Sequence, residues 1–116
     1  MTDEYSRPPT QWYDCSGFQR DLLLGVATHH RLEESPYGVA LQEWLDARYP
    51  HDVVRSRVYH NLGELVDADL LTRDPNSAYR TPYRLTDAGR QCLAAHGHFV
   101  DALDLSVLEP AAARDQ

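Results

Sequence analysis

The stretch RSRVYHNLG, residues 55–63, gathers side chains that can bind nucleic acid, and it contains no acidic residue. An arginine can donate two hydrogen bonds to guanine, and an asparagine can pair in the same way with adenine. The whole chain has 18 Asp and Glu against 11 Lys and Arg, with a formal net charge of −7. An ordinary solvated helix face of such a protein would be acidic, so the missing acids favour contact with DNA. The candidate residues are Arg55, Ser56, Arg57, His60 and Asn61.

Further candidate contacts lie in residues 70–86. Arg80 and Arg84 fall in a stretch without acids, whereas Arg73 stands beside an aspartate and is the weaker candidate. These arginines could reach phosphates or the minor groove, or they could protect the open edge of a β-hairpin by charge. Tyr59 also has two open roles, since its hydroxyl could touch a phosphate or its ring could pack under the start of a helix.

The sequence gives less support to a redox, metal or catalytic site. Cys15 and Cys92 lie far apart in the sequence and show neither a disulfide framework nor zinc-ligand spacing. Oxidant sensing needs an exposed thiolate near positive charge, but Cys15 follows an aspartate, and a free cysteine is usually a small buried hydrophobic residue. No metal-ligand spacing, Gly-rich phosphate loop or paired nucleophile and base is visible. We therefore expect no metal, no cofactor and no enzymatic activity.

The composition points to a particular environment. The chain has 116 residues, the length of one domain, and all 11 of its basic residues are arginine. Acidic, lysine-free surfaces are typical of proteins from salt-loving archaea, because short hydrated carboxylates keep a surface solvated in molar salt. The alternative is an ordinary acidic protein that lacks lysine by chance. No run approaches the ~18 apolar residues of a membrane span, and no signal peptide is visible, so we expect a cytoplasmic protein without membrane contact.

Three helices are predicted in the first two thirds of the chain. The first follows a capping box formed by Ser16 and Gln19. The second is predicted to begin at Ser35–Pro36, with serine as N-cap and proline in the first helical position. The third begins between residues 52 and 56. Its core face is predicted to hold Val54, Val58, Leu62, Leu65 and Val66, and its opposite face Arg57, His60, Asn61 and Glu64.

A hairpin and a last helix follow. Residues 70–74 and 79–86 are predicted strands joined by a PNSA turn, and Thr86 is predicted to cap a helix that runs to about Leu105. Residues 1–14 are a predicted N-terminal tail, with Trp12 and Tyr13 packed on the domain, and residues 109–116 a predicted disordered tail. Spacing of 4-3-4 on the last helix is typical of a coiled-coil seam. The predicted dimer interface comprises Cys92, His96, Phe99, Val100 and Leu103.

This order of elements predicts a mainly α fold with a two-stranded β-hairpin wing. Residues 15–86 would form a winged helix-turn-helix DNA-binding domain, and residues 87–108 a C-terminal dimerisation helix.

Two motifs resemble those of the PadR-like winged-helix regulators, in the form common in haloarchaea. The family's third helix has a small–x–aliphatic–Tyr–x–x–Leu pattern, and its second wing strand ends in Tyr–x–Leu–Thr–x–x–Gly. The segment SPYGVALQEWL is similar to the family's second helix, so the resemblance covers about residues 17–92. Asp69 stands where the family usually has glycine, at a position that needs the left-handed conformation. The matching positions are Ser56, Val58, Tyr59, Leu62, Tyr83, Leu85, Thr86 and Gly89.

The resemblance implies a homodimeric transcriptional regulator. Its third helix would enter the major groove of double-stranded DNA, its last helix would pair two copies, and its operator would be pseudo-palindromic with half-sites about one helical turn apart. Salt cations held between carboxylates and phosphates are a further expected partner. The alternative is a winged-helix module that binds protein instead of DNA, which the acidic net charge favours.

Overall fold

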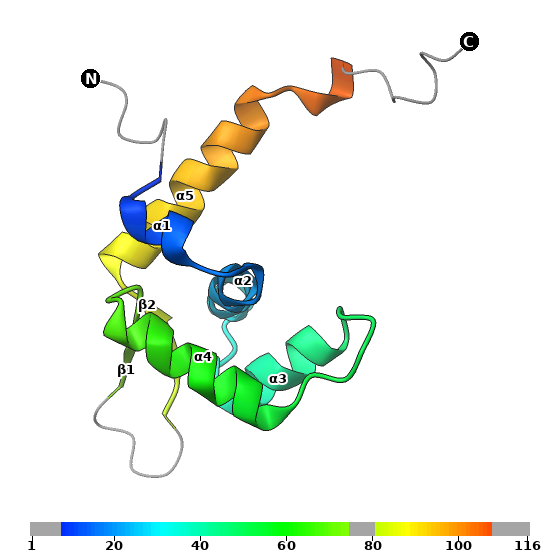
Figure 1. Cartoon of the computed structure of the whole chain (residues 1–116), viewed down its shortest axis with the longest axis vertical. Helices are drawn as coiled ribbons and strands as arrows, with labels where there is room; N and C mark the ends of the chain where they lie inside the picture. The colour runs from blue at the N-terminus through cyan, green and yellow to red at the C-terminus, as the bar shows by residue number, and fades with distance from the viewer. Residues whose placement is uncertain (1–7, 75–80, 108–116) are drawn as a thin grey trace.

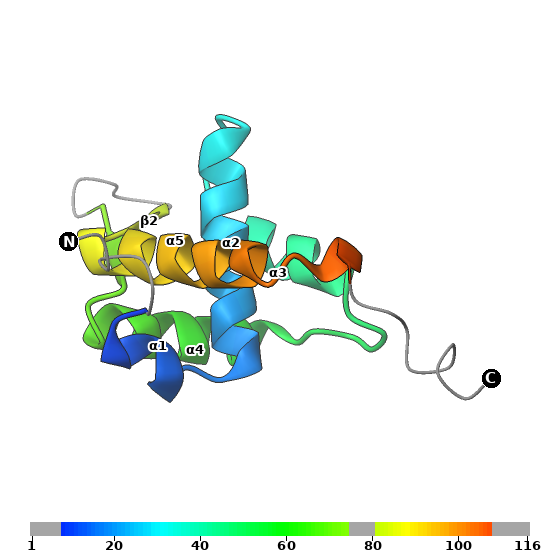
Figure 2. The same cartoon turned by 90° about the horizontal axis from the view of Figure 1, so that it is seen from above.

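The computed structural model describes residues 8–74 and 81–107. Helix α2 lies at its centre, with α5 on one side and the pair α3 and α4 on the other (Figure 1). The view from above shows α2 crossing both α5 and α4 (Figure 2). The elements in chain order are α1 (Thr10–Asp14), α2 (Gly17–Arg31), α3 (Gly38–Asp46), α4 (Arg55–Asp67), β1 (Leu71–Arg73), β2 (Tyr83–Leu85), α5 (Asp87–Ala102) and the short 3₁₀ helix η2 (Leu105–Val107).

The caps predicted for two helices are confirmed. At the start of α2, the Gln19 amide donates to the Ser16 hydroxyl, and the Ser16 amide donates to the Gln19 side chain, both at 3.1 Å. At the start of α5, the amide of Gly89 donates to the hydroxyl of Thr86 at 3.0 Å. Each cap provides an acceptor for an amide that has none within its helix.

Helix α3 starts later than predicted. It begins at Gly38, and the predicted N-cap and first residue, Ser35–Pro36, lie outside it. The reason is a contact with the hairpin, because the carbonyl of Pro36 accepts a hydrogen bond of 3.1 Å from the amide of Tyr83. Tyr37 is therefore extended and takes the N-cap position.

In the loop before α4, one residue predicted to lie in the core is exposed. Val54 was predicted to face the core, but it is the N-cap of α4 and is 55% exposed. Val53 is buried in its place. Its amide donates to the Asp46 carboxylate at 2.9 Å, and its carbonyl accepts from the Gln42 side chain at 3.0 Å. These two bonds turn the valine before the cap inward.

Two aspartates take the left-handed conformation. Asp69, just after α4, has a φ of 64°, which confirms the expectation from the sequence. Asp104 has a φ of 49° and ends α5 at Ala102, earlier than the predicted Leu105. Aspartate tolerates this conformation better than most residues other than glycine.

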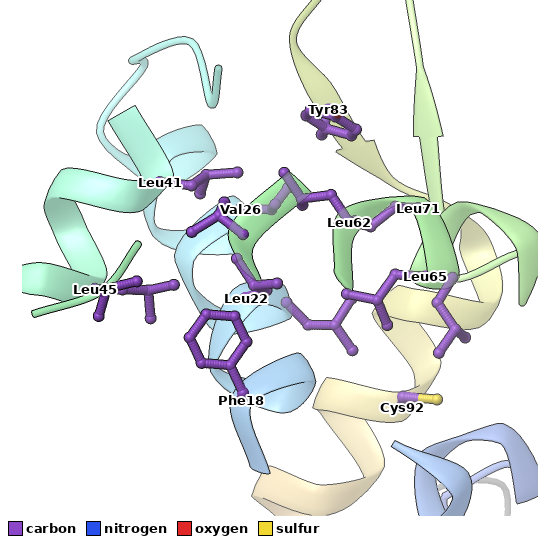
Figure 3. Close-up of a cluster of buried hydrophobic side chains, with 14 of the residues drawn as sticks. Phe18, Leu22, Val26, Leu41, Leu45, Leu62, Leu65, Leu71, Tyr83 and Cys92 are labelled. Atoms are coloured by element: carbon purple, nitrogen blue, oxygen red, sulfur yellow. The ribbon is translucent and has the colours of Figure 1, made fainter. Parts of the chain in front are cut away.

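The core fills the space between α2, α3, α4, the hairpin and α5 (Figure 3). Its largest fully buried side chains are Leu22, Leu23, Val26, Leu41, Leu45, Val58, Leu62, Leu65, Leu70, Leu71 and Cys92. Within the predicted N-terminal tail, α1 buries Trp12, as expected, while Tyr13 is 63% exposed and that expectation is wrong. The ring of Trp12 lies under the guanidinium of Arg20 and beside the ring of His96.

The hairpin is antiparallel and shorter than predicted, with Leu71 opposite Leu85 and Arg73 opposite Tyr83. Next to it, the Thr86 hydroxyl donates to the carbonyl of Asp69 at 2.6 Å, which ties the N-cap of α5 to the turn after α4. The predicted turn and residues 79 and 80 lie outside the described residues, as does the predicted C-terminal tail, 109–116.

Candidate nucleic-acid interface

One face of α4 points away from the protein. Since Val58, Leu62 and Leu65 are buried, residues about half a turn away around the helix point outward. These residues form the outward face, all of it exposed: Ser56, His60, Gly63 and Asp67. A Cβ added to Gly63 would meet nothing within 4 Å, so no contact within the described chain requires glycine there.

The flank of α4 that faces α2 is occupied by contacts within the chain. The Gln19 side chain donates at 3.0 Å to both Asn61 and Glu64. Asn61 in turn donates to the carbonyl of Arg57 at 2.8 Å, and His60 lies 3.3 Å from the Glu64 carboxylate. Asn61 therefore uses both ends of its amide within the protein.

Arg57 also belongs to this α2-side flank. Its guanidinium lies 3.9 Å from the centre of the Phe18 ring, an arrangement that stabilises both groups. The sequence had placed Arg57 and Asn61 opposite the core, and that placement is wrong, because both turn toward α2. A guanidinium stacked on a ring keeps its N–H groups at the ring's edge, so Arg57 still presents donors to solvent, and its side chain is exposed.

The opposite flank of α4 borders an open pocket. A Cβ on Gly38 would overlap the ring and hydroxyl of Tyr59, so only glycine lets that ring lie against the start of α3. The pocket beside it has a volume of about 440 Å³. We call it the tyrosine pocket, and it is lined by Tyr37, Gly38, Val39, Ala40, Glu43, Tyr59, Arg73, Thr81 and Tyr83.

Tyr83 forms the floor of this pocket from the hairpin. Its side chain is only 5% exposed, and the guanidinium of Arg73 lies 5.7 Å from the centre of its ring. Burial raises the pKa of the Tyr83 phenol, while the positive charge of Arg73 opposes that rise. The hydroxyl is therefore protonated at ordinary pH and is a hydrogen-bond donor.

The hairpin arginines separate to two sides of the wing. Arg73 lines the tyrosine pocket, whereas Arg84 borders a second hollow, of about 540 Å³, together with His30, Arg31 and Arg90. Neighbouring residues of a strand point to opposite faces, so Arg84 points away from the side that Tyr83 occupies. The third predicted wing residue, Arg80, lies outside the described residues.

The residues of the predicted dimer interface differ in how exposed they are. Phe99, near the C-terminal end of α5, and Leu103, just after it, are 50% and 48% exposed. This end of α5 extends away from the other helices (Figure 1). Val100 is half-buried, and His96 is half-buried against Trp12. Cys92 is wrong as an interface residue, because its side chain is 0% exposed within the core of its own chain. No surface of it remains for a second copy.

The cysteines lack the environment of reactive thiols. Burial raises the pKa of both Cys15 and Cys92, although the positive charge of Arg20 opposes the rise at each. Among the described residues, no three His, Cys, Asp or Glu side chains are grouped so that they could hold a metal ion. No helix in residues 8–74 and 81–107 is long and apolar enough to cross a membrane.

Three residues of this region were missed as site residues from the sequence. Two of them are Gly38 and Gly63, which differ in their surroundings. The ring of Tyr59 leaves no room for a Cβ at Gly38, whereas a Cβ at Gly63 would meet nothing within 4 Å. Tyr83 was noted only as part of a motif. Its position beside Tyr59 depends on how the hairpin meets α3, for which the sequence carries no local signal.

Comparison with known proteins gives one family. The sequence profile of the transcriptional regulator PadR-like family matches residues 29–95. RosR of H. salinarum, in a complex structure, is 28% identical over 91% of this chain and 85% of that chain, with a TM-score of 0.63. RosR from crystals grown from NaBr is 28% identical over 88% and 86% of the two chains, with a TM-score of 0.58.

A mutant of E. coli MarR complexed with operator DNA is 20% identical over 81% of this chain and 62% of that chain, with a TM-score of 0.56. At this identity the likeness concerns the fold alone. No curated protein sequence matches the chain.

Proposed function

Because the chain belongs to the PadR-like family of transcriptional regulators, we propose that it binds specific DNA sequences as a homodimer at high salt. The outward face of α4 carries this proposal. It is exposed, it carries Ser56, His60 and Gly63 with Asp67 at its C-terminal end, and Arg55 and Arg57 adjoin its start in the sequence. A helix beside a wing is the arrangement with which helix-turn-helix proteins enter the major groove. In the cytoplasm, such a protein would meet the chromosome directly.

We assign the DNA contacts by position. Ser56 and His60 would face base edges, and Arg55, at the start of α4, would reach a flanking phosphate. Arg57 would contact a phosphate with its exposed N–H groups, and Arg73 and Tyr59 would do so from the other flank. We no longer assign a base contact to Asn61, because its side-chain amide is bonded to Gln19 and to the helix backbone. Arg80 and Arg84 remain proposed wing contacts.

The dimer would form through the far half of α5. Phe99 and Leu103 lie four residues apart and expose apolar surface there. The side chains of Leu105 and Val107, in η2, are 54% and 69% exposed and extend this apolar surface along the chain. An apolar stripe of this kind usually meets another protein surface. Two copies joined through α5 would present two α4 helices, which suits a pseudo-palindromic operator.

High salt fits the surface charge of the protein. Between described residues, ion pairs join only His60 with Glu64 and Asp87 with Arg90. At molar salt the Debye length is about 3 Å, so repulsion between an acidic protein and DNA is largely screened. Cations held between carboxylates and phosphates would reduce it further. Affinity would then come from short-range contacts in the groove.

Fluorescence anisotropy with selected DNA tests the DNA-binding proposal. Fragments that bind the native chain in molar KCl are isolated from a random library and titrated with native chain, His60→Ala and the control His98→Ala, an exposed histidine of α5. Removing a base contact costs about 1–3 kcal/mol and relaxes sequence preference. We expect that loss for His60→Ala only. Failure of the native chain to enrich any sequence would favour the protein-binding alternative.

Titration with KCl tests the salt proposal on the same DNA. A basic regulator loses affinity steeply, with a slope near −0.9 in log affinity per phosphate contact against log salt. We expect a weak or inverted slope between sub-molar and multimolar KCl. Binding that is lost well below molar KCl would refute the adaptation to high salt.

Light scattering at micromolar protein and high salt tests the dimer. The native chain should have twice the mass of one copy, and Phe99→Asp combined with Leu103→Asp should lower it toward one copy. Leu32→Asp, which changes an exposed leucine at the end of α2, serves as the control and should remain dimeric. A monomeric native chain would contradict the proposal.

A further inference from the structure

The tyrosine pocket brings together hydrogen-bond donors from α3, α4 and the two strands of the hairpin. The first of these is the N-terminus of α3, whose N-cap, Tyr37, supplies no side-chain acceptor. The first bond within this helix runs from the amide of Leu41 to the carbonyl of Tyr37 at 2.9 Å. The amides of Gly38, Val39 and Ala40 therefore have no acceptor inside α3, and a helix N-terminus of this kind attracts negative charge.

The second donor is the hydroxyl of Tyr83, and it points to a ligand independently. The residue is 95% buried, and no hydrogen bond joins its hydroxyl to another described residue. Buried polar groups nearly always have a partner. The described residues include no completely buried side-chain oxygen or nitrogen without a partner, and Tyr83 is one of the residues that line the pocket, so we assign its hydroxyl to the pocket wall.

The remaining donors stand on either side. The ring of Tyr59 lies against Gly38, which holds its hydroxyl at the start of α3. Arg73 reaches the pocket from β1 and supplies the positive charge. The bond from the Tyr83 amide to the Pro36 carbonyl, 3.1 Å long, fixes the hairpin against α3, so the donors hold a set geometry. Glu43, on the second turn of α3, is the one acid among the lining residues.

We propose that the tyrosine pocket binds one backbone phosphate of the DNA and thereby fixes the register of α4 in the groove. The inference rests on the proposed function, since Tyr59 adjoins His60 of the outward face and the pocket would meet the strand that borders that groove. Phosphate oxygens only accept hydrogen bonds, which matches a pocket of amides, hydroxyls and a guanidinium. Such a contact positions the protein and carries no sequence information.

Single-atom variants test the pocket without removing a ring. Tyr83→Phe and Tyr59→Phe each delete one hydroxyl, and Tyr13→Phe, which changes an exposed tyrosine of α1, is the matched control. We expect each pocket variant to bind selected DNA about tenfold more weakly, the usual effect of losing a hydrogen bond to a charged group. The loss should be equal on unrelated DNA, and thermal unfolding should match the native chain.

A scan of the DNA identifies the phosphate. Each phosphate of the selected site is replaced in turn by a neutral methylphosphonate. One position should weaken binding of the native chain but leave Tyr83→Phe almost unaffected, because that variant has already lost the contact. Additive losses at every position would overturn the assignment.

Two further outcomes separate the possible failures. If the native chain binds no DNA, the proposed function fails first. If it binds DNA and Tyr83→Phe and Tyr59→Phe bind as well as Tyr13→Phe, the pocket proposal alone is refuted. Inorganic phosphate, added at constant ionic strength, distinguishes a free anion as the ligand. If phosphate raises the unfolding temperature of the native chain but not of Tyr83→Phe, and leaves DNA affinity unchanged, the pocket holds a free anion and the assignment to the DNA backbone is overturned.

Discussion

The two flanks of α4 carry similar residues but differ in what those residues contact. On the α2 side, Arg57 lies on Phe18, and Asn61 is held by Gln19. On the hairpin side, Tyr59 borders the tyrosine pocket, which Arg73 and the first residues of α3 also line. The first flank therefore stabilises the position of α4, and the second is the one that we propose to contact DNA. Residue type alone favoured the first flank as the one that reads bases, because arginine and asparagine are the usual readers.

The largest effect is expected where the open flank is blocked. Gly38→Ala would place a methyl group inside the ring of Tyr59 and displace it from α3. The overlapping atoms are the far end of a side chain that is 41% exposed, so the ring can swing outward and we expect little change in stability. Loss of the pocket should weaken DNA binding by at least about tenfold. Thermal unfolding and anisotropy measure the two effects.

Gly17→Ala is the matched control, because Gly17 is the first residue of α2 and has nothing within 4 Å. It should unfold and bind DNA like the native chain. If Gly38→Ala also behaves like the native chain, the close contact between Tyr59 and α3 has no importance for binding.

Comparing the two described hairpin arginines sharpens the contrast. Arg73→Gln removes the charge beside the tyrosine pocket. We expect about tenfold weaker binding and a slope of log affinity against log salt that is shifted by about 1 in the positive direction, as for a lost phosphate contact. Arg84→Gln, on the other side of the wing, should have a smaller effect. Anisotropy at two KCl concentrations measures both. A larger loss of affinity for Arg84→Gln would show that DNA lies on the Arg84 side of the hairpin, which would contradict the proposed contact at the tyrosine pocket.

A substitution at the centre of the outward face should change stability and DNA binding in opposite directions. Alanine is more favourable than glycine in a helix by about 1 kcal/mol, and Gly63 has open space around it. Gly63→Ala should therefore raise the unfolding temperature and weaken DNA binding several-fold, since the added methyl group would obstruct the approach of α4 to the groove.

Gly97→Ala provides the control, since Gly97 lies in α5 with equally open surroundings. It should raise stability without changing DNA affinity. Equal DNA affinity in both variants would exclude close approach of DNA at Gly63.

The smallest effect on binding is expected on the closed flank. Asn61→Ala breaks the link to Gln19 and should cost about 1 kcal/mol of stability, measured by denaturant unfolding. DNA affinity should change by less than about threefold, well below the tenfold of a lost base contact. A loss of sequence preference in this variant would show that Asn61 leaves Gln19 to contact a base.

Local patterns in the sequence predicted much of the fold. The caps at Ser16 and Thr86 were correct because each motif contains its own donor and acceptor. The start of α3 was wrong because its cause, the bond between Tyr83 and Pro36, joins residues distant in the chain. The end of α5 was also missed, because aspartate and not glycine takes the left-handed position at Asp104.

The candidate site followed the same rule. The face of α4 could be predicted from helical periodicity, which identified His60 as outward. Periodicity does not reveal which neighbouring side chain approaches each flank, so the contacts of Arg57 and Asn61 were missed. Burial of Cys92 was missed for a related reason, because 4-3-4 spacing describes an apolar stripe without saying whether the core or a second copy covers it.

Amide chemical shifts of the native chain, measured as selected DNA is added in high salt, test the central claim most directly. The account predicts the largest changes at the start of α3, on the outward face of α4 and at Arg73, with small changes at Asn61 and none at His98. Changes concentrated on α5, or absent from α3 and α4 while DNA is bound, would contradict it.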